Sequence, residues 1–240
     1  MIRTESSGMI RHGFGIKALD QNLHGGIPQG SMVLGVGPPG SGKSTLGKQL
    51  LLSTVNAGKP AILLSTGEPD QIILDSVKNL GMDFRGVEKI RLIDCFSWRA
   101  GFRNVPDLRK LDEVTTALDN LLSILRSTSG AVLVVDSLTD FLLNNPEGSV
   151  VNFLSQLKPL LQVREVTTLL EMERGPHDPK LESTIEFLAD GTIETKLDGS
   201  TRHMSIKRML ATPVQPRWVA FTIDKTVDAV LKEFFGSKEL

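Results

Sequence analysis

The sequence has 240 residues, of which 40% are apolar and 23% charged. These fractions are ordinary for a globular protein and exclude a disordered, collagen-like or coiled-coil chain. The 27 basic and 28 acidic residues leave a net charge of −1, so the overall charge gives no support to nucleic-acid binding.

The cysteine content and the hydropathy pattern bear on the compartment. Cys95 is the only cysteine, so no intramolecular disulfide and no cysteine-based zinc site can form, and we expect a reducing compartment. Residues 1–15 contain no apolar run of the kind found in a signal peptide. No stretch approaches 18 uninterrupted apolar residues. We therefore expect a cytoplasmic protein without a membrane span, with Cys95 in its core.

Short apolar runs alternate with segments of helical spacing along most of the chain. Such runs are typical of strands buried on both faces of a parallel sheet, and the alternation favours an α/β fold with right-handed crossovers. No repeat, low-complexity tract or long linker divides residues 1–240, so we expect one domain in which residues 1–14 form an N-terminal extension. The predicted strands are Met32–Val36, Ala61–Ser65, Ile90–Asp94, Ala131–Asp136 and Val166–Leu170.

Helices are predicted between these strands. A helix is expected over Ser44–Val55, directly after the first strand. Apolar residues recur every three or four positions over 108–125, after a candidate N-cap at Asp107. Val150–Val163 is expected to be a helix with a kink or an early break at Pro159.

The last third of the chain has a different character. Turn-forming residues separate three short predicted strands, which we expect to add to the sheet edge in antiparallel fashion. A closing helix is expected within residues 225–240, over Lys225–Phe235. The three strands are predicted at Gly191–Lys196, Met204–Leu210 and Trp218–Ile223.

A phosphate-binding loop follows the first predicted strand. Its glycines allow successive backbone N–H groups to face phosphate oxygens, and the next helix presents the positive end of its dipole to the same anion. Lys43 is expected to reach the β- and γ-phosphates of ATP, Ser44 to ligate Mg²⁺ and Thr45 to support the α-phosphate. The pattern G-x-x-x-x-G-K-[ST] is matched in full by Gly37, Pro38, Pro39, Gly40, Ser41, Gly42, Lys43 and Ser44.

An acidic residue completes the expected nucleotide site. Asp136 ends the apolar strand Ala131–Asp136, and a carboxylate there is expected to hold Mg²⁺ through water. The alternative is a capping role, since Ser137 follows. With the phosphate loop upstream, the sequence favours a site for ATP and Mg²⁺.

Seven segments in order resemble the single-domain KaiC-like ATPases of the RecA superfamily, which are found mostly in archaea. The resemblance covers Gly15 to Ile223. It implies a RecA-like, mostly parallel twisted sheet flanked by helices. It also implies a homo-oligomeric ring, often a hexamer, with ATP between protomers and a basic finger supplied by the neighbour. The segments are Gly15–Asp20, Gly25–Ser31, the phosphate loop, Asp136–Thr139, Leu188–Glu194, Arg202–Leu210 and Trp218–Ile223.

The sequence departs from the family at the residue that activates water. The family carries two adjacent glutamates after the second strand, and the alignment puts Gly67 and Glu68 at these positions. Glu68 is therefore the candidate catalytic base, alone, and slow hydrolysis is expected because a displaced base lowers the rate steeply. The alternative for Glu68 is a helix N-terminal acid beside Pro69.

The second departure lies in the basic finger. The resemblance puts Arg208 at the lysine of the family's Lys-x-Arg pattern and Leu210 at its arginine. Arg208 is thus the candidate finger that would stabilise γ-phosphate charge in trans, with a solvated strand charge as the alternative. Glu171 and Glu173 follow the fifth predicted strand. One of the two is a candidate γ-phosphate sensor, and a surface pair is the alternative.

Three functions remain open on the sequence. The first is a ring-forming ATPase, and the second an ATP-sensing scaffold with little turnover that acts on an unknown protein partner. The third is an accessory protein of DNA recombination or repair that binds single-stranded DNA. A local charge of +4 over residues 196–225 supports the third, but few aromatic residues interleave with the bases.

Overall fold

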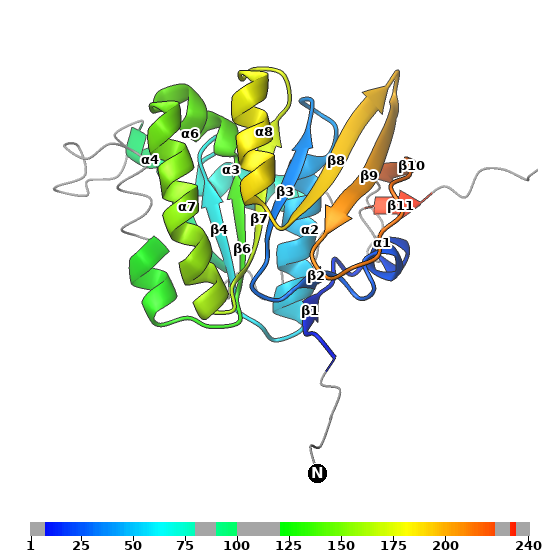
Figure 1. The fold of residues 1–240 in the computed structure, drawn as a ribbon, viewed down its shortest axis with the longest axis horizontal. Helices are drawn as coiled ribbons and strands as arrows, with labels where there is room; N and C mark the ends of the chain where they lie inside the picture. The colour runs from blue at the N-terminus through cyan, green and yellow to red at the C-terminus, as the bar shows by residue number, and fades with distance from the viewer. Residues whose placement is uncertain (1–7, 80–89, 100–120, 224–230, 234–240) are drawn as a thin grey trace, which may run out of the picture.

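The computed structural model describes residues 8–79, 90–99, 121–223 and 231–233, and a nine-stranded sheet is its main element (Figure 1). The order across the sheet is β11-β10-β9-β8-β3-β7-β6-β4-β5. Strands from β8 to β5 run parallel, and β9, β10 and β11 add in antiparallel fashion. The strands are β3 (Met32–Gly37), β4 (Ala61–Ser65), β5 (Ile90–Asp94), β6 (Val132–Asp136), β7 (Thr167–Glu173), β8 (Gly191–Asp198), β9 (Thr201–Met209), β10 (Val219–Ile223) and β11 (Leu231–Glu233).

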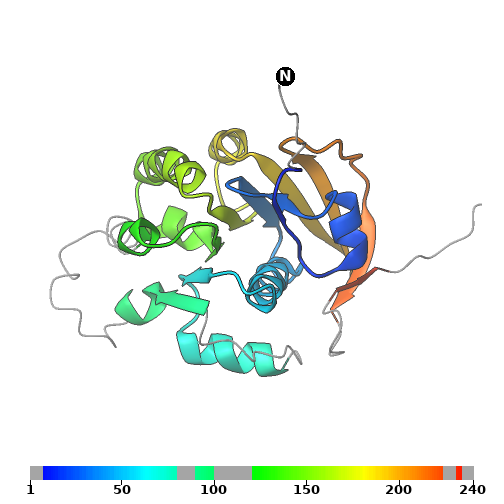
Figure 2. The ribbon, with the colours of Figure 1, turned by 90° about the horizontal axis from the view of Figure 1, so that it is seen from below.

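Helices cover both faces of the sheet (Figure 2). One apolar cluster packs α6, α7 and α8 against alternate strand residues such as Leu34 and Val135. A second cluster packs α1, α2 and α3 against the opposite face, through residues such as Val33 and Val134. Because β3 and β6 are buried on both faces, their sequences are continuously apolar. The helices are α1 (Lys17–Asn22), α2 (Lys43–Asn56), α3 (Asp70–Asn79), α4 (Cys95–Arg99), α6 (Leu138–Asn144), α7 (Glu147–Val163) and α8 (Pro179–Leu188).

The N-terminal segment is tied to the domain. Strands β1 (Arg11–His12) and β2 (Ile27–Pro28) form a separate two-stranded sheet. The Arg11 guanidinium donates to the carbonyl oxygens of Leu23 and Gly26 and to Thr212 Oγ1. Residues 8–14 of the expected extension therefore lie against the body of the protein, and no helix among the described residues is long and apolar enough to cross a membrane.

The five predicted central strands are confirmed, with end points shifted by at most three residues. The prediction that Gly191–Lys196 adds in antiparallel fashion is wrong, because β8 pairs in parallel with β3 and only the later strands are antiparallel. The break expected at Pro159 is absent, since α7 continues to Val163. Glu171 and Glu173 end β7 rather than follow it. Cys95 is buried, as expected.

Two helix predictions fall partly on residues outside the description. Of the helix expected over 108–125, the described residues 121–125 are helical. The closing helix over Lys225–Phe235 is wrong at Leu231–Glu233, which form β11 and pair with β10. A three-residue antiparallel pairing provides backbone hydrogen bonds that the local sequence does not reveal.

Candidate functional site

The phosphate loop joins β3 to α2. Gly42 precedes the first residue of α2 with φ at 99°, and Gly40 has φ at 71°, a region that non-glycine residues rarely occupy. Within the described part of the chain, no side chain caps the N-terminus of α2. The first N–H groups of this helix are therefore placed where an anion could accept hydrogen bonds from them.

Strands β8 and β9 brace the loop from the side. Ser41 Oγ donates to the Pro38 carbonyl and lies 2.7 Å from Thr195 Oγ1 of β8. Arg202 Nε of β9 donates to the Gly40 carbonyl over 2.9 Å. The loop conformation is thus fixed by the neighbouring hairpin, which reduces the ordering cost of binding phosphate.

Lys43 lies over the loop that it follows. Its ammonium donates to the carbonyl oxygens of Gly37 and Pro38, each over 2.9 Å, and lies 3.4 Å from Glu173 Oε1. The side chain is almost completely buried. A cation held at this place can interact with phosphate groups that bind in the loop.

Ser44 and Asp136 meet at the carboxyl edge of the parallel strands. Burial raises the pKa of the Asp136 carboxyl, at the end of β6, while the nearby Ser44 hydroxyl and the charge of Lys48 lower it. A hydroxyl and a carboxylate are hard oxygen donors of the kind that Mg²⁺ prefers.

The donor set fits Mg²⁺ rather than a metal held by protein alone. Among the described residues, no group of three or more His, Cys, Asp or Glu side chains is placed to hold a metal ion. Mg²⁺ usually keeps several waters and takes one or two protein ligands together with substrate phosphates. The Ser44–Asp136 pair at the end of a phosphate loop matches that requirement.

Glu171 is a buried acid for which the sequence left two roles open, a γ-phosphate sensor and a member of a surface pair. It lies beside Asp136 in the sheet register, and its side chain is 1% exposed. Burial raises the pKa of Glu171 well above its usual range, and the adjacent Asp136 charge raises it further. Neither carboxyl oxygen has a hydrogen bond of ordinary geometry to the described residues. The burial of Glu171 excludes a surface pair with Glu173.

Glu68 lies between β4 and α3, near the same edge. Its side chain is about half exposed, and Oε2 lies 3.5 Å from Lys48 Nζ. The negative charge of Glu68 is close enough to raise the pKa of Asp136. The backbone is held by Ser65, whose hydroxyl donates to the Glu68 carbonyl over 2.7 Å. The structure thus brings Glu68 to the Asp136 side of the site.

Lys48 is the residue of this site that sequence reasoning missed. It lies on α2, one turn after Ser44, and is buried. The spacing from Ser44 was a readable signal, because residues i and i+4 share a helix face. A lysine within an apolar helix gave no indication of its acidic partners, which come from two strands and from the β4–α3 connection.

Arg208 contacts α8 in the single chain. Its guanidinium donates to the carbonyl oxygens of Glu186 and Ala189, and the latter distance is 2.8 Å. These carbonyls belong to the last turn of α8 and to the residue after it, where a cation is favourable. Arg208 is therefore neither a purely solvated charge nor a partner of its own phosphate loop.

The other bases of the 196–225 window also have contacts within the chain. Lys196 and Lys207 lie 4.3 and 4.7 Å from the ring centre of Trp218, and Lys207 pairs with Glu194. Arg217 donates to Asn22 over 3.4 Å. Lys225 lies outside the described residues. Each described base of this window therefore has a contact within the chain.

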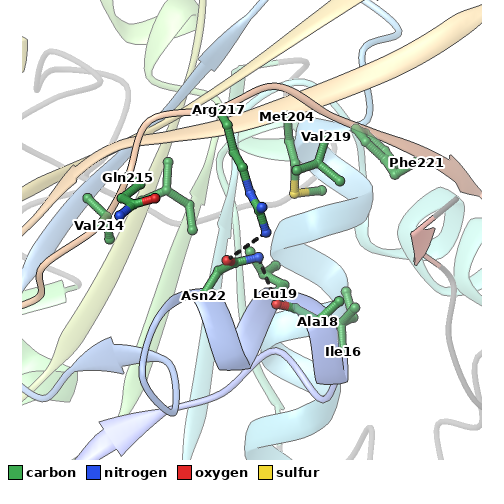
Figure 3. A pocket seen from close by; sticks show the side chains of 11 residues that line it. Ile16, Ala18, Leu19, Asn22, Met204, Val214, Gln215, Arg217, Val219 and Phe221 are labelled. Carbon is green, nitrogen blue, oxygen red and sulfur yellow. Dashed lines mark hydrogen bonds between the residues drawn. The ribbon is translucent and has the colours of Figure 1, made fainter. Parts of the chain in front are cut away.

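An apolar pocket lies between α1 and the β9–β10 edge (Figure 3). Leu19, Met204 and Val219 line its wall, and Arg217 and Asn22 meet at its rim. Phe221 joins the pocket to the phosphate loop, because a Cβ added at Gly42 would lie 3.1 Å from the Phe221 ring. The pocket is thus a neighbour of the nucleotide site.

Comparison with known proteins agrees with this geometry. A family model described as ATPase: KaiC matches residues 13–233. A UPF0273 protein of Saccharolobus solfataricus is 30% identical over 196 residues, which cover 76% of this chain and 68% of that protein. A UPF0273 protein of Pyrococcus furiosus is 29% identical, with 77% of each chain covered.

A solved structure has the same fold. The crystal structure of a KaiC-like protein from Pyrococcus horikoshii OT3 matches with a TM-score of 0.76 at 23% identity, covering 95% of this chain and all of that one. This likeness confirms the expected RecA-like architecture, a mostly parallel sheet flanked by helices.

Proposed function

Because the chain belongs to the KaiC-like ATPase family, within the ATP-binding RecA superfamily, we propose that it hydrolyses ATP slowly at the interfaces of a homo-oligomeric ring. The observation that carries the proposal is the placement of Ser44, in the first turn of the phosphate-loop helix, beside Asp136 at the end of β6. This placement joins a phosphate site to a carboxylate suited to Mg²⁺.

The residues of the loop have separable roles in this proposal. Free N–H groups at the start of α2 and the Lys43 ammonium bind the β- and γ-phosphates, and Thr45 supports the α-phosphate. Ser44 and Asp136 would hold Mg²⁺, which would neutralise phosphate charge when bound.

Glu68 is the proposed base. Its carboxylate accepts a proton from the attacking water and orients that water toward the γ-phosphate. Gly67 stands where the family carries its first glutamate. Glu68 therefore has to orient and deprotonate the attacking water without a second glutamate beside it. This departure supports slow turnover.

Arg208 is the proposed finger across the interface. In the single chain its guanidinium binds the end of α8, so it has to exchange backbone carbonyls for the neighbour's γ-phosphate. Such an exchange couples assembly to hydrolysis. A hexameric assembly agrees with the family resemblance. A reducing, cytoplasmic compartment agrees with the single cysteine, which is buried.

The test is ATP turnover per protomer across a range of protein concentrations, with Lys43→Ala as the blank. We expect a rate that rises with concentration and then saturates, because the interface completes the site. Bound ATP with turnover equal to the blank at every concentration would overturn hydrolysis and favour the ATP-sensing scaffold. Unchanged ATP affinity in Lys43→Ala would overturn the site assignment itself.

A further inference from the structure

Lys48 joins three elements at the proposed catalytic edge. It extends from α2, and its Nζ lies 3.5 Å from Glu68 Oε2 in the β4–α3 connection. The same nitrogen donates to Ser76 Oγ of α3 over 3.2 Å. The ammonium is therefore held between the phosphate-loop helix and the segment that carries the proposed base.

The surroundings of Lys48 are acidic and largely closed to solvent. The Lys48 side chain is 9% exposed. Its charge acts on Asp136 and on Glu171, and in both cases it lowers the pKa that burial raises. A buried ammonium requires partners, because desolvation of an unpaired charge is costly. The Lys48 ammonium thus has its polar partners among the groups at this edge of the site.

Glu68 has few other constraints on its side chain. About half of that side chain is exposed, and the contacts of Ser65 reach the backbone of Glu68 rather than its carboxylate. An exposed glutamate samples several rotamers and loses entropy when it is fixed. Among the described residues, the Lys48 ammonium is the cation that contacts this carboxylate.

We propose that Lys48 is a positioning residue for ATP hydrolysis, whose ammonium holds the Glu68 carboxylate against the phosphate-loop helix so that it can orient the attacking water. This inference rests on the proposed function, in which Glu68 is the base. It gives the chain a means of fixing one carboxylate where Gly67 has removed the other.

An effect of Lys48 through Asp136 has to be separated from its effect through Glu68. Both acids lie near the ammonium, and loss of Lys48 also makes the potential at the metal site more negative. A double-mutant cycle makes the separation, because an effect transmitted by Glu68 disappears once Glu68 is replaced. An effect transmitted by Asp136 persists.

The experiment measures kcat and KM for ATP in Lys48→Met, Glu68→Gln and the double variant, with single-turnover rates for the slow forms. We expect Lys48→Met to lower kcat about tenfold with KM changed less than about threefold, since a misplaced base affects the transition state. The double variant should react at the rate of Glu68→Gln alone. Lys48→Arg should recover most of the lost rate by keeping the charge.

The matched control is Lys158→Met. Lys158 also pairs with a carboxylate, Asp190 Oδ1 at 2.6 Å, and donates to the Leu188 carbonyl, at the end of α8. Loss of that pair should leave kcat within about twofold of the wild type. A similar loss of kcat in both lysine variants would overturn the positioning role.

The remaining outcomes are equally decisive. If the losses in the double variant multiply, or if Lys48→Met keeps full kcat, the positioning role is overturned while the ATPase proposal stands. If the wild type does not exceed the Lys43→Ala blank, the ATPase proposal fails and the positioning role fails with it. Should Lys48→Met fail to fold, Ser76→Ala weakens the same anchor and should lower kcat by about twofold, only when Glu68 is present.

Discussion

Gly47 shows how closely α2 approaches the acids behind the phosphate loop. A Cβ at this position would overlap Glu171 Oε1 and lie 2.8 Å from Val134 Cγ1. The helix therefore packs so closely against β6 and β7 that position 47 has no room for a side chain. This approach is what brings Ser44 and Lys48, on the same helix, to Asp136.

Gly47→Ala should destabilise the protein although alanine is the better helix former. Propensity alone favours alanine by about 1 kcal/mol, but the overlap with Glu171 and Val134 forces a backbone shift that costs about 1–3 kcal/mol. Denaturant unfolding of Gly47→Ala and Gly148→Ala gives the comparison, since a Cβ at Gly148 in α7 meets nothing within 4 Å.

Gly148→Ala should be neutral or slightly stabilising. Shortening the acid in Gly47→Ala/Glu171→Ser should recover part of the lost free energy of unfolding, because it removes the overlapping oxygens. If both alanine variants prove equally stable, α2 does not approach Glu171 as closely as described.

The smallest sheet of the fold, β1 with β2, contains a buried histidine. His12 is 4% exposed, and the path of the chain requires Gly26, because a Cβ there would overlap the His12 carbonyl. Burial, assisted by the charge of Lys59, lowers the pKa of His12 from 6.5 to about 4. The neutral imidazole is therefore the form that this strand accepts.

Acidification should weaken the attachment of β1. The folded-state pKa lies below the unfolded value, so the stabilisation is complete above pH 6.5 and is lost as the pH falls toward 4. Between pH 7 and pH 5 the loss amounts to about 2 kcal/mol. His12→Gln should show a smaller decrease in the free energy of unfolding over this range, measured by denaturant titration. An identical pH slope in the two proteins would contradict the burial of a neutral His12.

At the scale of elements, predictions succeeded where the information was local. Buried strands such as β4 and β6 are continuous apolar runs, so Ala61–Ser65 was predicted to the residue. The phosphate loop was located by its own spacing. The early break expected at Pro159 is absent because α7 is held by its apolar face, through residues such as Leu157 and Leu161, which compensates for one missing hydrogen bond.

The features that the sequence did not predict depend on contacts between distant segments. Lys48 and Glu171 are 123 positions apart, and only the packing of α2 on β7 makes them neighbours. The parallel direction of β8 follows from its pairing with β3, which α8 permits as a crossover. The sequence predicts Arg208 to be either a solvated charge or a finger across an interface. Its contact with the end of α8 escapes this prediction because the position of α8 depends on the same crossover.

Under the proposed function, each molecule contains the parts of two half-sites. Strands β8 and β9 brace the phosphate loop, while Arg208 lies near the end of β9 and binds the end of α8. In the proposed ring the interface is heterologous, so each protomer presents its loop to one neighbour and its finger to the other. Two different inactive variants can then combine into an active interface.

Complementation between Lys43→Ala and Arg208→Met is the resulting prediction. Each variant alone should turn over ATP at the blank rate, one for lack of binding and the other for lack of the finger. Co-expressed in equal amounts and mixed at random, they should recover about a quarter of the wild-type rate, because one interface in four pairs an intact loop with an intact finger. Absence of any recovery in mixed assemblies of confirmed composition would contradict a finger acting in trans.

Strand β9 joins these two half-sites through one stiff segment. At one end Arg202 holds the Gly40 carbonyl of the chain's own loop, and six residues further on Arg208 holds α8. In the proposed ring, release of α8 by Arg208 would pull on the strand that steadies the loop. The nucleotide state of one site would then be transmitted to the next in one fixed direction around the ring. ATP hydrolysis by the protomers would therefore be sequential rather than simultaneous.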